Sequence, residues 1–595
     1  MNLYELPLVP SEPEPIPPQL CNPTNEQRRN LLKYALKQTG RIEDYPNIVN
    51  LLSPPPDITT HCSPGRYKGI RVAVIGAGLA GLSASFELRK LGFDITIFDA
   101  LTERIGGRVY TYYFDKERNL YGELGPMRIP VGHETTWHYI NLFGLDTRPF
   151  IQTNENGLIY VRNTRVRNDM EGKNVMRKIY PKFPLTPWEK RTPWTKLIEF
   201  GLGSPLFSLS PEIRKEILEI KPRYHPQFQY WNSLSIRQVL ELMGLSKGAI
   251  DLIGSLSPFI QSFFYNSYSE FMEDEYAMEF SFLYEIIGGM TRLPVSFYES
   301  LNAVSPKEYL HIPKDALGSV HWKRGHWVKG IQYAEHQSRV ALLFSDGDGS
   351  RTFCELFDYV LCTVPFSCLR NIDIYPAFSN LKMEAVREVN YTSAQKTLLL
   401  CKERFWEQGR IAHRIIGGGS FTDMPITSIY YPSDHGKCIE ARGIRRYMHE
   451  SFFDRYDLHG GCSPYIPGVL LASYNLNLDA VRLGNQKSSI RYQQIKEQIR
   501  KVHGLTKNYL DEMVEDHITV HWNTEPWFKG AFAYYMPRQK ELFSYAMITP
   551  EYNNRVFFAG EHTSATHSWM QGALHSGMTA ANMLARQAGM DMRVR

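Results

Sequence analysis

The sequence predicts an α/β fold that combines a doubly wound, Rossmann-like domain with a mixed-sheet domain and an inserted helical domain. A short apolar run, Arg71–Ile75, leads into a glycine-rich turn, a helical apolar period over 79–91 and a second apolar run, Asp94–Asp99. This succession is typical of a β-α-β unit with a parallel sheet. From 176 to 287 the pattern changes to aromatic and polar residues at helical spacing, which predicts a mainly helical insert.

Length and charge narrow the class of protein. The chain has 595 residues, too many for one simple domain, and 43% of them are hydrophobic, which is ample for a buried core. Lysine and arginine (67) nearly balance aspartate and glutamate (62), and no long run of one sign occurs. A nucleic acid or a membrane surface attracts a concentrated basic face, so we expect neither as a partner.

The ends of the chain and its cysteines indicate where in or outside the cell the protein is found. Residues 1–25 form an arm rich in proline and acids, and a helical stretch over 26–52 stops at three consecutive prolines, 54–56. The N-terminus has no basic and apolar signal pattern, and no run of ~18 apolar residues occurs. The 8 cysteines are scattered without a C-x-x-C pair. We therefore expect an intracellular protein.

The glycine-rich turn predicts a dinucleotide site. Gly76 allows the tight turn, Gly78 lets the backbone approach a pyrophosphate at the helix N-terminus, and Gly81 lets helix and strand pack closely. Asp99 ends the second strand, where a carboxylate accepts hydrogen bonds from ribose hydroxyls and disfavours the 2′-phosphate of NADP. The predicted contacts are Gly76, Gly78, Leu79, Ala80, Gly81, Asp99 and Ala100.

The segment Arg104–Arg108 follows the second strand and distinguishes FAD from NAD. It resembles the second flavin-binding segment of the flavin monoamine oxidase superfamily, in which two glycines permit close backbone approach and an arginine meets the flavin or its phosphates. That family usually has glutamate where Asp99 stands, and the loop here is one residue longer, so Gly107 and Arg108 are the assigned contacts. The resemblance implies FAD. We expect it to be non-covalent, because no cysteine stands beside the segments expected to line the flavin ring.

The segment Glu123–Arg128 resembles the part of L-amino-acid oxidases that runs along the flavin ring and presents an arginine to the substrate carboxylate. A guanidinium offers carboxylate a rigid two-pronged contact and keeps its charge at any working pH. Amine oxidases whose substrates have no carboxylate do not need this group, so Arg128 separates the sub-classes. Gly125, Pro126, Met127 and Arg128 itself are assigned to the cofactor side.

Three further strands agree with this family. Lys396 resembles the lysine that holds a water bridged to flavin N5. Tyr474, at the end of the apolar run Gly468–Tyr474, resembles the tyrosine whose hydroxyl gives the carboxylate its second contact. The stretch 322–331 resembles the strand pair that binds the adenine, with Val328 as its backbone contact.

The segment Arg555–Gly572 resembles the C-terminal flavin segment of the same superfamily. Its glutamate, Glu561, is directed towards the ribityl or phosphate region, and the helix that follows faces the flavin. Trp569 stands where an aromatic ring walls the substrate. Ser568 stands where the family often has glycine, whose carbonyl accepts a hydrogen bond from the substrate amine. The assigned cofactor contacts here are Gly560, Glu561, Trp569 and Met570.

The resemblance runs from residue 71 to about 586 and implies a domain order. We assign an N-terminal arm and helix to 1–65, a discontinuous FAD-binding domain to 66–118, 288–388 and 530–595, a substrate-binding domain to 119–175 and 389–529, and a helical domain to 176–287. Further strands are expected at 320–345, 357–364, 394–402 and 468–474, and a last helix from about 569.

The function that the resemblance implies is oxidative deamination of free L-amino acids to 2-oxo acids, with release of ammonia and hydrogen peroxide. Arg128 and Tyr474 would hold the carboxylate, Trp569 would wall the substrate, and Lys396 would assist the reaction with dioxygen. Aromatic residues of the insert favour large or apolar side chains. The expected partners are the amino acid, dioxygen and further copies of the chain in a homodimer or larger oligomer.

Alternatives remain open. A flavin amine oxidase, an oxidative decarboxylase or a dehydrogenase that reduces a carrier would keep the FAD motifs. A flavin-bound interaction protein would be free to lose Arg128 and Lys396. His133 and His138 are five positions apart, which on a helix turns them ~140° from each other, so we expect no metal site.

Overall fold

The computed structural model describes residues 15–169, 171–347, 349–410, 413–438 and 463–594. Residues 1–14 of the predicted N-terminal arm lie outside these ranges. The helical stretch predicted over 26–52 is two helices, α1 (Asn25–Gln38) and α2 (Tyr45–Leu52). Gly40 turns the chain between them with a φ of +68°, a conformation that glycine adopts without steric cost.

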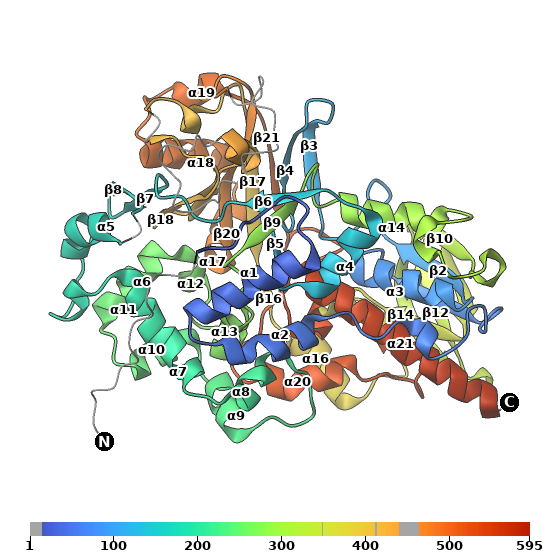
Figure 1. The fold of residues 1–595 in the computed structure, drawn as a ribbon. Coiled ribbons are helices and arrows are strands. Elements are labelled where there is room, and N and C mark those ends of the chain that lie inside the picture. Colours follow the sequence, from blue (N-terminus) through green and yellow to red (C-terminus); the bar gives the residue numbers. More distant parts are fainter. Residues whose placement is uncertain (1–14, 170, 348, 411–412, 439–462, 595) are drawn as a thin grey trace.

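A five-stranded parallel sheet forms one centre of the molecule (Figure 1). In spatial order its strands are β10 (Val320–Arg324), β2 (Asp94–Asp99), β1 (Arg71–Ile75), β14 (Tyr359–Cys362) and β23 (Val556–Phe558). Strands β1 and β2 with helix α3 (Leu79–Lys90) are the predicted β-α-β unit. The last helix, α21 (Met570–Val594), begins where the sequence predicts and packs against α3.

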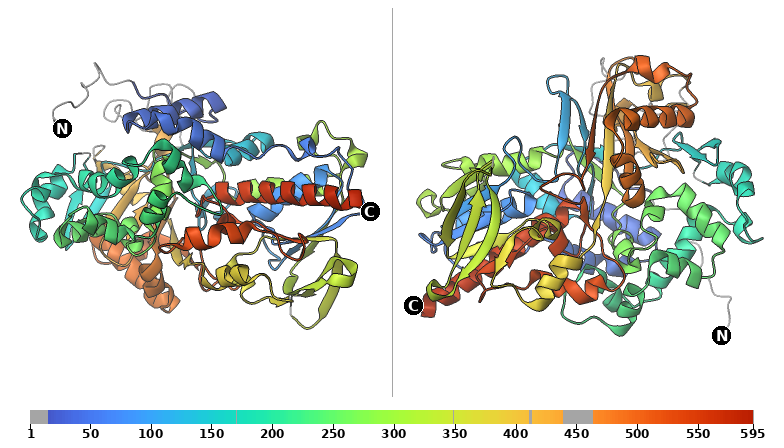
Figure 2. Two further views of the ribbon diagram at one scale, coloured as in Figure 1. Left: turned by 90° about the horizontal axis from the view of Figure 1, so that it is seen from below. Right: turned by 180° about the vertical axis from the view of Figure 1, so that it is seen from behind.

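Strand β1 shows why both faces of this sheet are covered. Val72 and Val74 point to the side of α3 and α21, while Ala73 and Ile75 point to the other side, as the two-residue period of a strand requires. A second sheet covers that other side (Figure 2). Its order is β13 (Thr352–Phe357), β12 (Arg339–Ser345), β11 (Trp327–Ala334) and β15 (Asp373–Tyr375).

A seven-stranded mixed sheet forms the second centre. Its order is β21 (Val514–His521), β17 (Ala394–Cys401), β20 (Gly468–Leu476), β19 (Ser428–Tyr430), β18 (Gly419–Thr422), β7 (Leu158–Val161) and β8 (Thr164–Arg167). Two small ribbons are β3 (Thr111–Asp115) with β4 (Leu120–Glu123) and β16 (Tyr391–Thr392) with β22 (Phe532–Ala533). The register of β17 and β20 places Lys396 directly opposite Tyr474.

The predicted insert is helical over most of its length. Its α-helices are α5 (Lys173–Lys178), α6 (Trp194–Ile198), α7 (Ser204–Phe207), α8 (Pro211–Arg214), α9 (Pro226–Asn232), α10 (Ile236–Leu242), α11 (Lys247–Leu256), α12 (Pro258–Ser262) and α13 (Tyr268–Tyr276). Its last residues are instead a strand, β9 (Leu283–Ile286), between β5 (Ile129–Pro130) and β6 (Thr147–Phe150). The exact domain boundaries stay a prediction.

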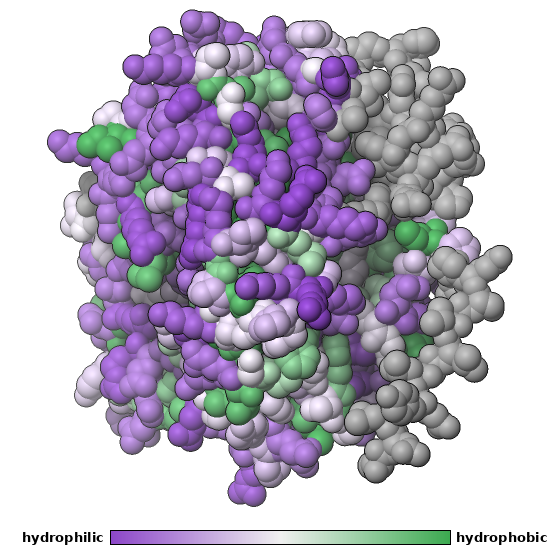
Figure 3. Space-filling model, turned by 90° about the vertical axis from the view of Figure 1, so that its left-hand side faces the viewer, coloured by the Kyte–Doolittle hydropathy of each residue, from purple (hydrophilic) through white to green (hydrophobic). Residues whose placement is uncertain are grey.

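The remaining α-helices surround the sheets. They are α4 (Glu134–Phe143), α14 (Arg292–Asn302), α15 (Phe366–Leu369), α16 (Asn380–Glu388), α17 (Asn477–Gly484), α18 (Ser488–His503), α19 (Tyr509–Met513) and α20 (Gln539–Ile548). Within the described ranges, every helix is too short or too polar to span a bilayer. Hydrophilic side chains dominate the coloured part of the face in Figure 3, and apolar ones stand there singly or in small groups.

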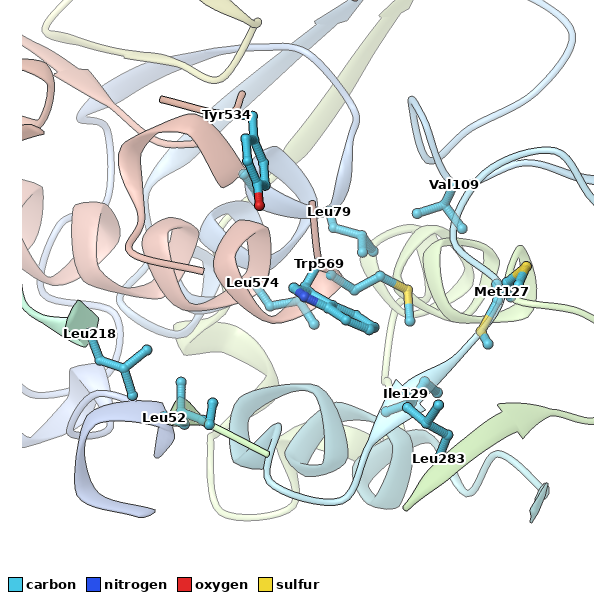
Figure 4. Packing of buried hydrophobic residues seen from close by; sticks show 14 of the residues in the cluster. Leu52, Leu79, Val109, Met127, Ile129, Leu218, Leu283, Tyr534, Trp569 and Leu574 are labelled. Carbon is cyan, nitrogen blue, oxygen red and sulfur yellow. The ribbon is translucent and has the colours of Figure 1, made fainter. Parts of the chain in front are cut away.

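The main core joins the domains. Figure 4 shows Leu79 of α3, Met127 and Trp569 around one buried region, with Leu283 of the insert's strand nearby. Complete burial of one such aliphatic side chain contributes about 1.5–3 kcal/mol of transfer free energy. This shared packing holds the glycine turn, the Arg128 segment and the start of α21 at one place.

Candidate active site

A cavity of about 480 Å³ begins at the carboxyl ends of the parallel strands and reaches helix α13 of the insert. Ligands of open α/β sheets bind at this edge. Of the predicted site residues, Gly81 alone does not line the cavity. The predicted residues that line it are Gly76, Gly78, Leu79, Ala80, Asp99, Ala100, Gly107, Arg108, Gly125, Pro126, Met127, Arg128, Val328, Lys396, Tyr474, Gly560, Glu561, Ser568, Trp569 and Met570.

The glycine turn has the shape that a pyrophosphate needs. A Cβ on Gly78 would meet no atom within 4 Å, so the backbone here is open to the cavity. Helix α3 begins after Gly78 without a side-chain cap, which leaves backbone N–H groups facing that space. Gly81 acts from behind, because a Cβ there would lie 2.0 Å from the carbonyl oxygen of Gly76. It is a packing residue, as the helix–strand approach requires.

Asp99 closes the same turn. Its two carboxylate oxygens accept hydrogen bonds of 2.7 Å from the backbone N–H groups of Ala77 and Leu101. Burial raises the pKa of Asp99, and these two bonds oppose the rise. A carboxylate oxygen has a further lone pair, so Asp99 keeps the capacity to accept a ribose hydroxyl.

Arg108 and Glu561 join two segments that are far apart in the chain. Arg108 Nη1 donates to Glu561 Oε1 and to the carbonyl oxygen of Ala531, both at 2.9 Å. Glu561 also accepts from the backbone N–H of Ala533 at 3.1 Å. The pair holds the turn after β23 against the segment after β2 and presents charged groups to the cavity. An uncapped helix end, glycine backbone and an ion pair fit an adenine dinucleotide with a flavin.

The start of α21 places the tryptophan wall. Trp569 donates from Nε1 to Asp274 Oδ1 at 3.0 Å, and its ring lies 5.7 Å from that of Phe280. Ser568, directly before it, has a φ of +68°. This left-handed conformation favours glycine, so the residue type that the family often has here suits the backbone.

Arg128 is buried, with 8% of its surface exposed. Its Nη1 donates to Gln152 Oε1 at 2.7 Å, and its guanidinium lies 4.8 Å from the ring centre of Phe280. It makes no ion pair with any residue that the structure describes. A buried cation without an anionic partner is costly. The site is therefore suited to a ligand that brings a carboxylate.

Lys396 and Tyr474 lie side by side across β17 and β20. Lys396 Nζ donates to the carbonyl oxygen of Gly125 at 2.6 Å and lies 4.6 Å from the Tyr474 ring centre. Burial lowers the pKa of Lys396, while the nearby Glu123 opposes that effect. Burial raises the pKa of Tyr474 to about 12, so its hydroxyl keeps its proton and can donate it to a carboxylate.

The sequence did not identify several residues of the cavity wall. Asp274 and Phe280 come from the insert and belong to no motif, whereas Phe259 belongs to the aromatic run 259–265 that is expected to contact the substrate side chain. Cys368 also lines the cavity. Cys368 lies beyond β14, far in sequence from every flavin-like segment. Burial raises the pKa of its thiol, which disfavours the thiolate that a covalent attachment would require.

Comparisons with known proteins agree with this geometry. Residues 79–585 match the family described as flavin containing amine oxidoreductase. An L-amino-acid oxidase of Daboia russelii is 31% identical over 522 residues, which cover 87% of this chain and 89% of that protein. One of Vipera ammodytes ammodytes is 30% identical, with 87% and 92% covered.

Solved structures show the same fold. A putrescine oxidase bound to putrescine superimposes with a TM-score of 0.58 at 16% identity, covering 88% of this chain and 100% of that one. Its A394C mutant superimposes with a TM-score of 0.59 at 17% identity. The α/β fold and the FAD cofactor expected from the sequence are thereby confirmed. The chain belongs to the flavin containing amine oxidoreductase family and is an FAD-dependent oxidoreductase.

Proposed function

We propose that the protein is an L-amino-acid oxidase that converts free L-amino acids, dioxygen and water into 2-oxo acids, ammonia and hydrogen peroxide. The observation that carries this proposal is Arg128, a buried guanidinium on the cavity wall without a described anionic partner. Relatives at about 30% identity that are named L-amino-acid oxidase support the same reaction.

The chain's own groups have separate roles in this proposal. Arg128 and the Tyr474 hydroxyl hold the substrate carboxylate, and Trp569 limits the motion of the substrate beside them. Such orientation converts a bimolecular encounter into a reaction at fixed geometry. The carbonyl oxygen of Ser568 receives the neutral α-amine. When bound, FAD supplies a two-electron acceptor for a hydride from Cα, and dioxygen takes both electrons in the end.

Lys396 supports the half of the reaction that uses dioxygen. Reduction of dioxygen to hydrogen peroxide develops negative charge, which a buried ammonium stabilises more strongly than an exposed one. Its contact with the carbonyl oxygen of Gly125 fixes the ammonium next to the Arg128 segment. Water converts the imino acid product to the 2-oxo acid after the oxidation.

The test is the oxidation of L-amino acids by the FAD-loaded protein and by Arg128→Gln. The wild type is expected to release peroxide and ammonia in equal amounts from L-amino acids and none from the matching amines without a carboxylate. Arg128→Gln removes a charge-assisted pair of hydrogen bonds, so kcat/KM is expected to fall by about 10²–10³-fold. Flavin absorbance of the variant controls for loss of FAD.

Three other outcomes would assign a different reaction. Turnover of amines that have no carboxylate would make the protein an amine oxidase and remove the role of Arg128. Carbon dioxide and an amide as products would indicate oxidative decarboxylation. Reduction of an artificial carrier without peroxide would indicate a dehydrogenase.

A further inference from the structure

Asp274 is the acidic residue of the insert that reaches the cavity. It lies on α13, its side chain lines the cavity, and 8% of its surface is exposed. Trp569 Nε1 donates to its Oδ1 at 3.0 Å, which fixes the carboxylate next to the predicted substrate wall. The aromatic rings of Phe259 and Phe280 line the same side. A carboxylate on an otherwise aromatic wall is unexplained by the reaction at Cα.

Behind Asp274 the insert buries three more carboxyl groups. Glu273, Asp274 and Glu279 each place an oxygen within 4.8 Å of the others, and Glu270 lies one turn earlier on α13. Three cations face this group: His567, paired with Glu270; Lys540, which donates to a backbone carbonyl; and Arg128, whose charge acts to lower the pKa of Asp274. His133 contacts Glu279 but is neutral, because burial lowers its pKa to about 3.

Asp274 is the member of this cluster suited to carry negative charge. Burial raises the pKa values of Glu273 and Glu279 well above their ordinary range, so these two carboxyls hold protons. Burial raises the pKa of Asp274 as well, but hydrogen bonds from Glu279 and Trp569 oppose the rise. A carboxylate that accepts two such bonds at a cavity wall attracts a cation far more strongly than one in water.

A buried polar group without a partner also lies beside this cluster. The hydroxyl of Tyr534 is buried and has no hydrogen-bond partner among the described residues. All four carboxyl groups raise its pKa further beyond the effect of burial, which places them close to it. Figure 4 shows this hydroxyl directed towards the region of Trp569. Buried polar groups in folded proteins nearly always have a partner.

We propose that Asp274 binds a positively charged side-chain group, so that the preferred substrates are L-amino acids with a cationic side chain of the lysine, ornithine or arginine type. This inference rests on the proposed function, in which Arg128 holds the α-carboxylate. The aromatic walls formed by Phe259, Phe280 and Trp569 would pack on the methylene stem and also favour a cation through their faces. The aromatic residues alone suggest substrates with large apolar side chains. Because of Asp274, we expect a cationic side chain instead.

The experiment compares L-lysine with L-norleucine, which has the same stem without the ε-amine. For the wild type, kcat/KM for L-lysine is expected to exceed that for L-norleucine by on the order of 10- to 100-fold, the value of one charge-assisted hydrogen bond. Asp274→Asn retains an acceptor for Trp569 Nε1 and is expected to bring this ratio close to one. The exposed pair of Glu241 with Arg237 on α10 offers a matched control, so Glu241→Gln should keep the wild-type ratio.

A binding measurement separates this inference from the proposed function. In wild-type protein, flavin absorbance titrations with 6-aminohexanoate and with hexanoate are expected to give at least 10-fold tighter binding of the amine. Neither ligand has an α-amine, so their binding does not depend on turnover. If no amino acid is oxidised but the amine still binds more tightly, the proposed function fails and the Asp274 site stands.

Several results would overturn the inference. A wild-type kcat/KM for L-norleucine equal to or above that for L-lysine would contradict it. So would an equal loss of kcat/KM for both substrates in Asp274→Asn, which is the result expected if Asp274 served the α-amine. Equal affinity for 6-aminohexanoate and hexanoate would contradict it even if the variant fails to fold. A stoichiometric divalent metal in the purified protein would assign the carboxyl cluster to that metal instead.

Discussion

Lys396 is the residue whose chemistry is easiest to separate from substrate binding. Lys396→Met keeps the length of the side chain and removes the ammonium that donates to Gly125. We expect the rate of reaction of the reduced enzyme with dioxygen to fall by ~10²-fold, because the charge that develops on oxygen loses its counter-ion. Anaerobic reduction by substrate should change by less than a few-fold. Stopped-flow absorbance measures the two half-reactions separately.

Lys382 supplies the control for this prediction. It is also a fully buried lysine, but it lies on α16 and donates to the carbonyl oxygens of Met547 and Thr549, away from the cavity. Lys382→Met should leave both half-reactions at wild-type rates. Equal losses in the two half-reactions of Lys396→Met would contradict the role given to its ammonium.

At the scale of elements, two glycines of the turn between β1 and α3 have different roles: Gly81 allows the helix to pack on the strand, and Gly78 leaves room for the cofactor. Gly81→Ala would place a Cβ 2.0 Å from the carbonyl oxygen of Gly76, so α3 must move away from β1. Such overpacking costs about 1–3 kcal/mol. We therefore expect a lower melting temperature for the FAD-free protein, measured by thermal denaturation.

Gly78→Ala is the matched variant three residues earlier. Its Cβ would meet nothing within 4 Å, and a φ of −77° suits alanine, so the FAD-free protein should melt as the wild type does. The new methyl group would occupy cavity space next to the helix N-terminus, and FAD affinity is expected to fall by at least 10-fold. A Gly78→Ala protein that binds FAD normally would remove this turn from the cofactor site.

At the scale of the whole molecule, Lys382 makes folding stability depend on pH. Burial lowers its pKa from 10.5 to about 7 in the folded chain. Between these values the unfolded chain binds more protons, so the free energy of unfolding rises as the pH increases from about 7 to about 10.5. The contribution of one group is at most about 1.4 kcal/mol per pH unit.

Lys382→Met is expected to remove the contribution of Lys382 and so to reduce the slope over the same pH window, while Lys396 and Lys540, whose pKa values burial also lowers, keep theirs. Denaturant unfolding at several pH values between 7 and 10 measures the slope. Lys507 is exposed, so Lys507→Met should retain the wild-type slope. An unchanged slope in Lys382→Met would show that this ammonium is solvated or paired in the folded protein.

The sequence alone determined the features that contiguous residues encode. The turn at Gly76 and Gly78, the acid at Asp99 and the strands on either side depend on local backbone conformation and on a two-residue or helical period. These patterns predicted the β-α-β unit, and the family resemblance added the Arg128 segment and the start of α21. That resemblance supplied the roles that no local pattern carries.

Only the tertiary structure decided which distant side chains meet. It placed Lys396 opposite Tyr474 through strand register, and it paired Arg108 with Glu561 across 453 positions of sequence. It also showed a break between α1 and α2 and brought Asp274 of the insert to the cavity. Such contacts arise from the packing of whole elements around a shared core, and no short stretch of residues encodes them. Local motifs therefore predict the class of flavin-dependent oxidoreductase, whereas packing forms the cavity wall that we propose to select the substrate side chain.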